Sequence, residues 1–169
     1  MQAIETDRLR LRNFTADDGP ALLKMIVQYQ ASPYAQYDQP WPADLEEIKG
    51  VASWFAGGDD YLAVCLKESG VFIGFVCLNP EARDGEPAVN IGYIFDADYH
   101  GHGYATEACR AALARAFTVL GVTRVVTGTA RANLPSIRLL ERLCLREEAE
   151  REGCFLLTRE EWQRTVPKG

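Results

Sequence analysis

One segment of this chain carries the clearest structural signal: Asn90-Ile91-Gly92-Tyr93-Ile94-Phe95-Asp96-Ala97-Asp98-Tyr99-His100-Gly101-His102-Gly103-Tyr104-Ala105-Thr106-Glu107-Ala108. Its first part alternates as a strand does, with Ile91, Tyr93 and Phe95 on one face. A glycine turn at 101–103 follows, and alanines then recur at helical spacing from Ala105 onward. The segment therefore predicts a strand, a tight turn and a helix that lies close against a sheet.

The glycine turn is placed where a helix begins. A helix N-terminus presents unpaired N–H groups and a partial positive charge, so it binds phosphate well. Gly101 and Gly103 remove side chains that would block a close approach of the backbone to a pyrophosphate, and Thr106 adds a hydroxyl. A dinucleotide-binding fingerprint would need glycine or alanine at Thr106, and the Gly-Lys-Ser/Thr of a P-loop is absent. A phosphate site and a plain tight turn both fit this pattern.

Apolar periodicity and breaker residues predict the remaining elements. We expect strands at 9–13, 61–66, 71–78, 87–95, 124–130, 146–150 and 154–159. We expect helices at 17–29, 45–56, 104–120 and 133–144. The order β-α-α-β-β-β-α-β-α-β-β belongs to the mixed α/β (α+β) class. At 169 residues without a linker, the chain is expected to form one domain over 1–169.

Composition and charge limit the function classes. The N-terminus lacks the layout of a signal peptide and no apolar stretch would span a bilayer, so we expect a cytoplasmic protein without a membrane partner. Five cysteines, an odd number without a C-x-x-C pair, indicate reduced core thiols. A net charge of −6 argues against nucleic acid and is compatible with a cationic amine substrate. A monomer and a homodimer are both compatible with the sequence.

Residues 31–42 form a loop by their three prolines, yet the loop is rich in aromatic residues. Tyr34, Tyr37 and Trp41 suit a wall that faces the substrate, because binding residues favour loops. A packed surface loop is the alternative. The two histidines, His100 and His102, both lie in the glycine turn, and no nearby cysteine completes a metal site, so no metal is expected.

The turn His100-Gly101-His102-Gly103-Tyr104-Ala105 resembles the pyrophosphate motif of the GNAT superfamily of acyl-CoA transferases, Gln/Arg-x-x-Gly-x-Gly/Ala, with His100 replacing Gln or Arg. The Gly-Tyr-Ala-Thr-Glu-Ala that follows is similar to the branch containing the ribosomal-protein N-terminal (alanine/serine) acetyltransferases. Residues 5–12 resemble the opening strand of that branch, and 133–143 resemble its Asn-x-x-Ser helix. This resemblance, over residues 4–150, implies a GNAT-like fold: a central, mostly antiparallel sheet with a splayed parallel strand pair, flanked by about four helices.

The resemblance implies that acetyl-CoA is the cofactor. Its pyrophosphate would lie on the N–H groups of residues 101–105, and its pantetheine amides would pair with the main chain near Ile94 and Phe95. Asn133 would hydrogen-bond the pantetheine arm, cap its own helix, or do both. Arg142 would approach the nucleotide end or remain solvated. The cofactor-binding residues implied in this way are Tyr93, Ile94, Phe95, His100, Gly101, His102, Gly103, Tyr104, Ala105, Thr106, Asn133 and Ser136.

The implied mechanism is direct attack of a neutral amine on the thioester in a ternary complex, with a main-chain N–H of the splayed strand polarising the carbonyl. Leu140 stands where many members carry the tyrosine that protonates the thiolate. Ser136 is the candidate acid, with an ordinary first-turn helix serine as the alternative. Asn90 stands where relatives often carry a glutamate base, and it would orient a water instead.

A site without an obvious base favours a weakly basic acceptor. We therefore expect an N-acetyltransferase that acts on a protein or peptide N-terminal α-amine. A polyamine- or antibiotic-modifying acetyltransferase is a second interpretation on the same scaffold. A non-catalytic acyl-CoA-binding sensor is the third, because the tyrosine and the glutamate are both missing. Residues 151–169 look short for the closing hairpin of the family.

Overall fold

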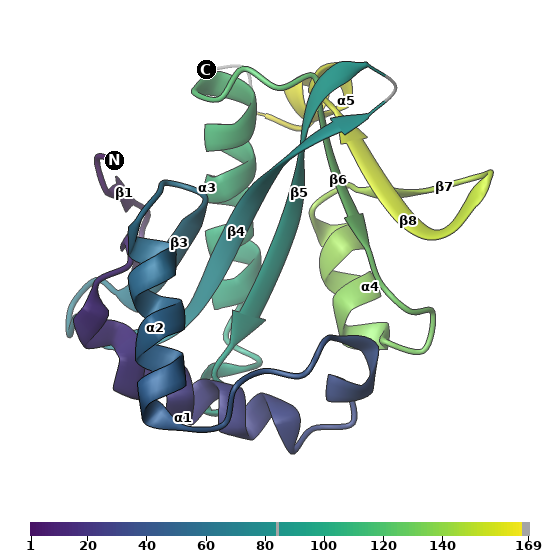
Figure 1. Ribbon diagram of the computed structural model, residues 1–169. Coiled ribbons are helices and arrows are strands. Elements are labelled where there is room, and N and C mark those ends of the chain that lie inside the picture. Colours follow the sequence, from purple (N-terminus) through teal and green to yellow (C-terminus); the bar gives the residue numbers. More distant parts are fainter. Residues whose placement is uncertain (84, 167–169) are drawn as a thin grey trace.

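The computed structural model describes residues 1–83 and 85–166, which form one eight-stranded sheet with helices on both faces (Figure 1). The strands are β1 (Ile4–Glu5), β2 (Leu9–Asn13), β3 (Tyr61–Leu66), β4 (Phe72–Arg83), β5 (Glu86–Phe95), β6 (Arg124–Gly128), β7 (Arg146–Glu148) and β8 (Arg151–Thr158). The α-helices are α1 (Gly19–Gln30), α2 (Leu45–Ala56), α3 (Tyr104–Thr118), α4 (Leu134–Arg142) and α5 (Arg159–Thr165). Three short 3-10 turns join them: η1 (Ala16–Asp18), η2 (Ala35–Tyr37) and η3 (Ala97–Tyr99).

The strands follow the spatial order β1-β2-β3-β4-β5-β6-β8-β7. Every neighbouring pair is antiparallel except β5 and β6, which run parallel. The structure thus confirms the predicted α+β class and the predicted mostly antiparallel sheet with one parallel pair.

Two apolar cores lie on opposite faces of the sheet. On one face, α1 and α2 pack through side chains such as Ile26 and Phe55 against Phe75 of β4. On the other face, Ala108, Ala112 and Ala116 of the predicted alanine stripe of α3 are fully buried against β2, β4 and β5, together with Leu140 of α4, and Ala105 is partly buried. Small alanine side chains let α3 approach the sheet closely, which brings the N-terminus of this helix next to the end of β5.

The parallel pair is short, and the two strands then separate. Only three residue pairs join them, from Ala88↔Arg124 to Asn90↔Val126. β5 remains paired with β4 up to Gly74↔Phe95, while β6 remains paired with β8 up to Gly128↔Cys154. Figure 1 shows β5 and β6 diverging toward the lower half of the view, with α4 at the lower end of β6. From Ile91 to Phe95, β5 therefore has a strand partner on its β4 side alone.

The predicted element bounds differ from the observed ones mainly near the end of the chain and in β4. β4 continues to Arg83, five residues beyond the prediction, because it pairs with β5 over the whole hairpin. β6 ends at Gly128, and β1 and α5 are additional to the prediction. α5 begins with a capping box between Thr158 and Glu161. The closing part of the chain is thus a hairpin followed by this short helix, and 167–169 lie outside the described residues. In the described ranges, no helix is both long enough and apolar enough to cross a membrane.

Candidate active site

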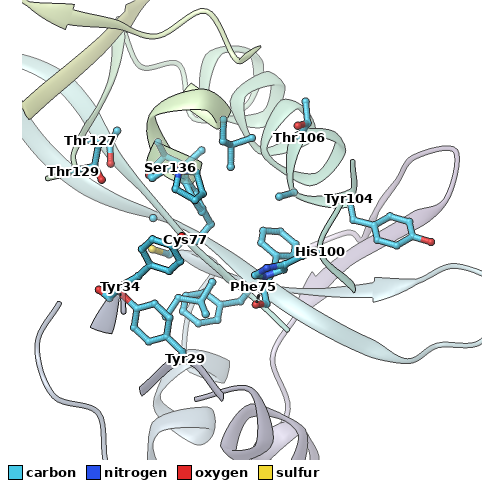
Figure 2. A pocket seen from close by; sticks show the side chains of 18 of the residues that line it. Tyr29, Tyr34, Phe75, Cys77, His100, Tyr104, Thr106, Thr127, Thr129 and Ser136 are labelled. Carbon is cyan, nitrogen blue, oxygen red and sulfur yellow. Dashed lines mark hydrogen bonds between the residues drawn. The ribbon is translucent and has the colours of Figure 1, made fainter. Parts of the chain in front are cut away.

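One cavity of about 1610 Å³ passes through the gap between β5 and β6. At one end it is lined by the glycine turn and the first residues of α3, and at the other by the aromatic loop after α1 (Figure 2). We call the end near α3 the donor half and the end near the aromatic loop the acceptor half. The cavity therefore connects the two faces of the sheet at the place where the sheet opens.

The glycine turn lies where the sequence predicts it, directly before α3. Gly101 and Gly103 have φ of 79° and 80°, in the left-handed region that favours glycine. A Cβ at Gly101 would have no atom within 4 Å, so the turn borders open space. Within the described chain, the N–H groups of residues 101–106 donate to no main-chain carbonyl. These N–H groups at the positive end of α3 are suited to an anion.

A partly buried glutamate joins this turn to the start of β2. Glu107 Oε1 accepts hydrogen bonds from Thr6 Oγ1 at 2.6 Å and from Arg8 N at 2.9 Å, and Glu107 Oε2 accepts one from Arg8 Nε at 2.7 Å. The same Arg8 guanidinium donates to the His102 carbonyl at 2.9 Å and lies over the Tyr104 ring. Burial alone would raise the pKa of Glu107, but the hydrogen bonds from Thr6 and Arg8 outweigh burial and lower that pKa. Arg8 and Glu107 together hold the turn in place.

The two histidines have different positions. His100 lines the cavity, and its Nε2 lies 2.9 Å from the Phe95 carbonyl, so Nε2 carries the proton in this contact. His102 is not among the residues that line the cavity, and its Nδ1 lies 2.8 Å from the His100 carbonyl while its ring stacks on Tyr104. Its predicted contact with the cofactor would therefore be through the main chain.

The start of α4 faces the donor half from the β6 side. Asn133 caps the helix by accepting a hydrogen bond from Ser136 N at 3.3 Å, and this bond uses only its Oδ1. Thr106 Oγ1 accepts from Arg142 Nε at 3.3 Å, which brings two residues of the predicted nucleotide end together. The four residues joined by these two hydrogen bonds all line the cavity: Asn133, Ser136, Thr106 and Arg142.

A pair of hydroxyl groups bridges the gap itself. Tyr93 Oη of β5 lies 2.8 Å from Ser136 Oγ of α4. Burial raises the pKa of Tyr93 well above 10, and the hydrogen bond with Ser136 only partly offsets that effect. Leu140, at the position where the family tyrosine was expected, is fully buried in the core. From the sequence, Tyr93 was predicted only as a cofactor-binding residue, and the structure adds its phenol to the site.

The acceptor half begins at Asn90. Asn90 Nδ2 donates to Glu81 Oε2 of the neighbouring strand β4 at 3.3 Å. Glu81 also lies 3.6 Å from Arg83, and it was not singled out from the sequence. Nearby, burial raises the pKa of the Cys77 thiol to about 11, so this cavity-lining thiol stays protonated at neutral pH.

The predicted aromatic wall lies at the far end of the acceptor half. Tyr34, Tyr37 and Trp41 all line the cavity, and Trp41 packs edge-on against Phe55 of the core. Figure 2 shows Tyr34 beside Tyr29 of α1, at the opposite end of the cavity from Thr106. The structure thus brings together in one cavity every residue predicted for the site except the His102 side chain. The functional assignments themselves remain predictions.

A glycine turn at a helix N-terminus, beside two parallel strands that separate, is the architecture of acyl-CoA N-acyltransferases. The family model described as the acetyltransferase (GNAT) domain matches residues 8–146. The chain belongs to this family, and the protein is an acyltransferase enzyme of the GNAT type.

Individual relatives agree with this assignment. The chain is 27% identical to an uncharacterized N-acetyltransferase of Bacillus subtilis, YnaD, over 98% of this chain and 89% of that protein. A GNAT-family acetyltransferase of Bacillus anthracis superposes with a TM-score of 0.81 at 22% identity, covering 95% of this chain and all of the other. A putative ribosomal-protein-serine acetyltransferase of Vibrio cholerae gives a TM-score of 0.76 at 24% identity, covering 93% and 97%. The two structural matches establish the fold.

The contacts of Glu107 predict a pH-dependent contribution to stability. Since folding lowers its pKa below the ordinary 4.5, the carboxylate stabilises the fold above that pH, and the effect is lost as the pH falls through the lowered value. Glu107→Gln should lower the free energy of unfolding by about 1–3 kcal/mol at pH 7. The difference from wild type should shrink in denaturant titrations repeated toward pH 3.5. Glu68→Gln, in an exposed turn, is the control, and a deficit of Glu107→Gln that is the same at both pH values would contradict the assignment.

Proposed function

We propose that this enzyme transfers the acetyl group of acetyl-CoA to the α-amine of a peptide or protein N-terminus, by direct attack in a ternary complex. The observation that carries the proposal is the single cavity joining the N-terminus of α3, the gap beside β5 and the aromatic loop. Such a cavity would hold donor and acceptor on opposite faces of the sheet, with the reacting groups meeting in the gap. The solved relatives include a putative ribosomal-protein-serine acetyltransferase, which supports a protein α-amine as the acceptor.

The donor half fits coenzyme A. The free N–H groups of residues 103–106 would bind the pyrophosphate, and the main-chain groups of Ile94 and Phe95, without a strand partner on this side, would pair with the pantetheine amides. Asn133 Nδ2 remains available to the same arm. Arg142, held by Thr106, would contribute positive charge at the nucleotide end. When bound, acetyl-CoA supplies an activated acetyl thioester in the gap.

The hydroxyl pair is the proposed acid. Because burial keeps the Tyr93 phenol protonated, Tyr93 holds a proton next to Ser136, and Ser136 Oγ would donate to the leaving sulfur. A phenol reaching the gap from β5 would thus take the place of the tyrosine that is absent at position 140 of α4. The two hydroxyls would act as one unit.

Asn90 would orient the incoming amine or a water. Because its Nδ2 donates to Glu81, the Asn90 amide oxygen is the acceptor left on this side chain, and an amine N–H or a water would bind there. Glu81 fixes this orientation of the amide, which makes Glu81 a positioning residue. A proton leaving the amine would pass to water along this side of the cavity.

The absence of a carboxylate base at Asn90 bears on the type of acceptor. Deprotonating a lysine of pKa near 10.4 at pH 7 costs about 4.6 kcal/mol, whereas an α-amine near 7.8 costs about 1.1 kcal/mol. At neutral pH a site of this kind would use the fraction of acceptor that is already neutral. This fraction is much larger for an α-amine.

A panel of acceptors tests the proposal through the release of free thiol. At pH 7 a peptide with a free α-amine should react roughly two orders of magnitude faster than an N-terminally blocked peptide with one lysine. The ratio should narrow as the pH is raised toward 10, because the neutral fraction of lysine then increases. Polyamines and aminoglycosides complete the panel, and a strong preference for the lysine peptide at pH 7 would refute the assignment.

The hydroxyl pair gives a second test. Tyr93→Phe and Ser136→Ala should each lower kcat by about 100-fold, because general acid catalysis typically contributes that much. The double variant should be little slower than either single one, since the two groups act together. Steady-state kinetics at saturating acetyl-CoA measures kcat for the wild type, the two single variants and the double variant. Two single variants that both retain a third or more of wild-type kcat would show that the pair does not supply the proton.

A further inference from the structure

The acceptor half of the cavity has a distinctive charge. Among the described residues that line it, Asp38 is the one charged side chain, and aromatic rings surround it. The donor half, in contrast, is lined by three arginines, Arg8, Arg110 and Arg142, against two acidic residues, Asp7 and Glu107, and by the positive end of α3. The cavity is therefore positive where an anionic cofactor is expected and negative at the opposite end.

The Asp38 carboxylate is held in place by its own loop. Trp41 Nε1 donates to Asp38 Oδ2 at 3.3 Å, and Gln39 N donates to Asp38 Oδ1 at 2.8 Å. The Trp41 ring packs in turn against Phe75 of β4, with ring centroids 6.1 Å apart. The main-chain carbonyl of Trp41 accepts a hydrogen bond from Gln30 Nε2 at 2.7 Å. The carboxylate thus has a defined position relative to the sheet although it is exposed.

The Asp38 carboxylate affects the neighbouring Tyr29 phenol, but no cationic side chain of the described residues neutralises its charge. Burial, together with the charge of Asp38 and hydrogen bonding to it, raises the pKa of the Tyr29 phenol to about 12. No lysine or arginine within residues 1–83 and 85–166 forms an ion pair with Asp38. Among the other exposed carboxylates at turns and helix ends in the described chain, Asp59 and Asp98 have cationic partners, whereas Asp7 and Asp60 form no ion pair.

We infer that Asp38, with Tyr34 and Trp41, forms a subsite for a second positive charge on the acceptor, an ammonium or guanidinium group other than the amine that is acetylated. An ammonium or guanidinium gains from a carboxylate and from the faces of aromatic rings together. This inference rests on the proposed function and adds a charge requirement to it. The cation would come from a basic side chain close to a peptide N-terminus or from the far end of a diamine.

The amine that is acetylated is a poorer occupant of the Asp38 subsite than a second cation. A carboxylate next to an ammonium raises the pKa of that ammonium and keeps it protonated, and a protonated amine does not attack a thioester. Asp38 is also exposed, on the loop that borders the outer end of the cavity, whereas the gap between β5 and β6 lies at Asn90 and Tyr93. A second cation at Asp38 would instead orient the acceptor so that its neutral amine points into the gap.

Matched acceptors test the subsite. Three peptides that differ only at the second residue, lysine, glutamine or glutamate, are compared by kcat/KM for thiol release, with 1,4-diaminobutane and butylamine as the small-molecule arm. The wild type should prefer the lysine peptide over the glutamine peptide by about tenfold, equivalent to about 1.4 kcal/mol. Asp38→Asn should reduce this ratio to about twofold or less, and Asp38→Lys should invert the preference toward glutamate. A preference seen only in the diamine arm would identify the small amine as the source of the cation.

Controls separate this inference from the proposed function. Glu68→Gln removes another exposed carboxylate, one outside the cavity, and should keep the wild-type ratio. Equal kcat/KM for the lysine and glutamine peptides, together with equal values for the two small amines, would overturn the subsite. So would an Asp38→Asn variant that slows every acceptor by the same factor. If no acceptor is turned over, the proposed function fails, and calorimetric affinities of the same peptides still test whether Asp38 selects the cation.

Discussion

The separation of β5 from β6 is the constraint on which the rest of this site depends. After three parallel residue pairs, β5 remains paired with β4 and β6 remains paired with β8. The sheet therefore opens between β5 and β6 while the pairing on either side of the opening continues. The inner edge of β5 keeps main-chain groups without a strand partner, and backbone polar groups left in this way seek a partner of similar geometry. A pantetheine arm, which carries two amides, is a partner of that kind. A fully paired strand would close both the edge and the cavity.

Several contacts keep the opening in a defined shape. The Arg8–Glu107 contacts hold the glycine turn from the β2 side. Lys24 of α1 donates to Asp96 at 3.0 Å, directly after the end of β5, and Asp96 is buried. The Tyr93–Ser136 hydrogen bond links β5 to α4 across the gap. The same polar groups that would serve chemistry therefore also fix the spacing of the elements around the gap.

Much of the fold could be predicted because its signals are local. The strands at 9–13 and 61–66 show clear apolar patterns, and the helix at 45–56 has Asp44 as its cap and glycines after its end. The predicted bounds of all three elements agree with the structure. The glycine turn before α3 could be predicted for the same reason, since its conformation depends on Gly101 and Gly103 themselves. The short helix α5 was missed, although its capping box can be recognised in the sequence.

The side-chain chemistry of the site could not be predicted in the same way, because it depends on residues far apart in the chain. Arg8 and Glu107 are 99 positions apart, and Tyr93 and Ser136 are 43 apart. The contact of Asn90 with Glu81 depends on the register of the β4–β5 hairpin, and the predicted end of β4 at residue 78 leaves Glu81 outside the strand. Asp38 lay within the predicted aromatic loop, but only the tertiary fold places it in the cavity.

Residue-resolved amide hydrogen exchange, recorded with and without coenzyme A, tests the central claim most directly. The N–H groups of 103–106 and those on the open edge of β5 near Ile94 and Phe95 should become protected together when coenzyme A is added. The amides of the β2–β3 pair, far from the gap, should exchange as before. Binding of coenzyme A without protection at either place, or no binding at all, would contradict the account.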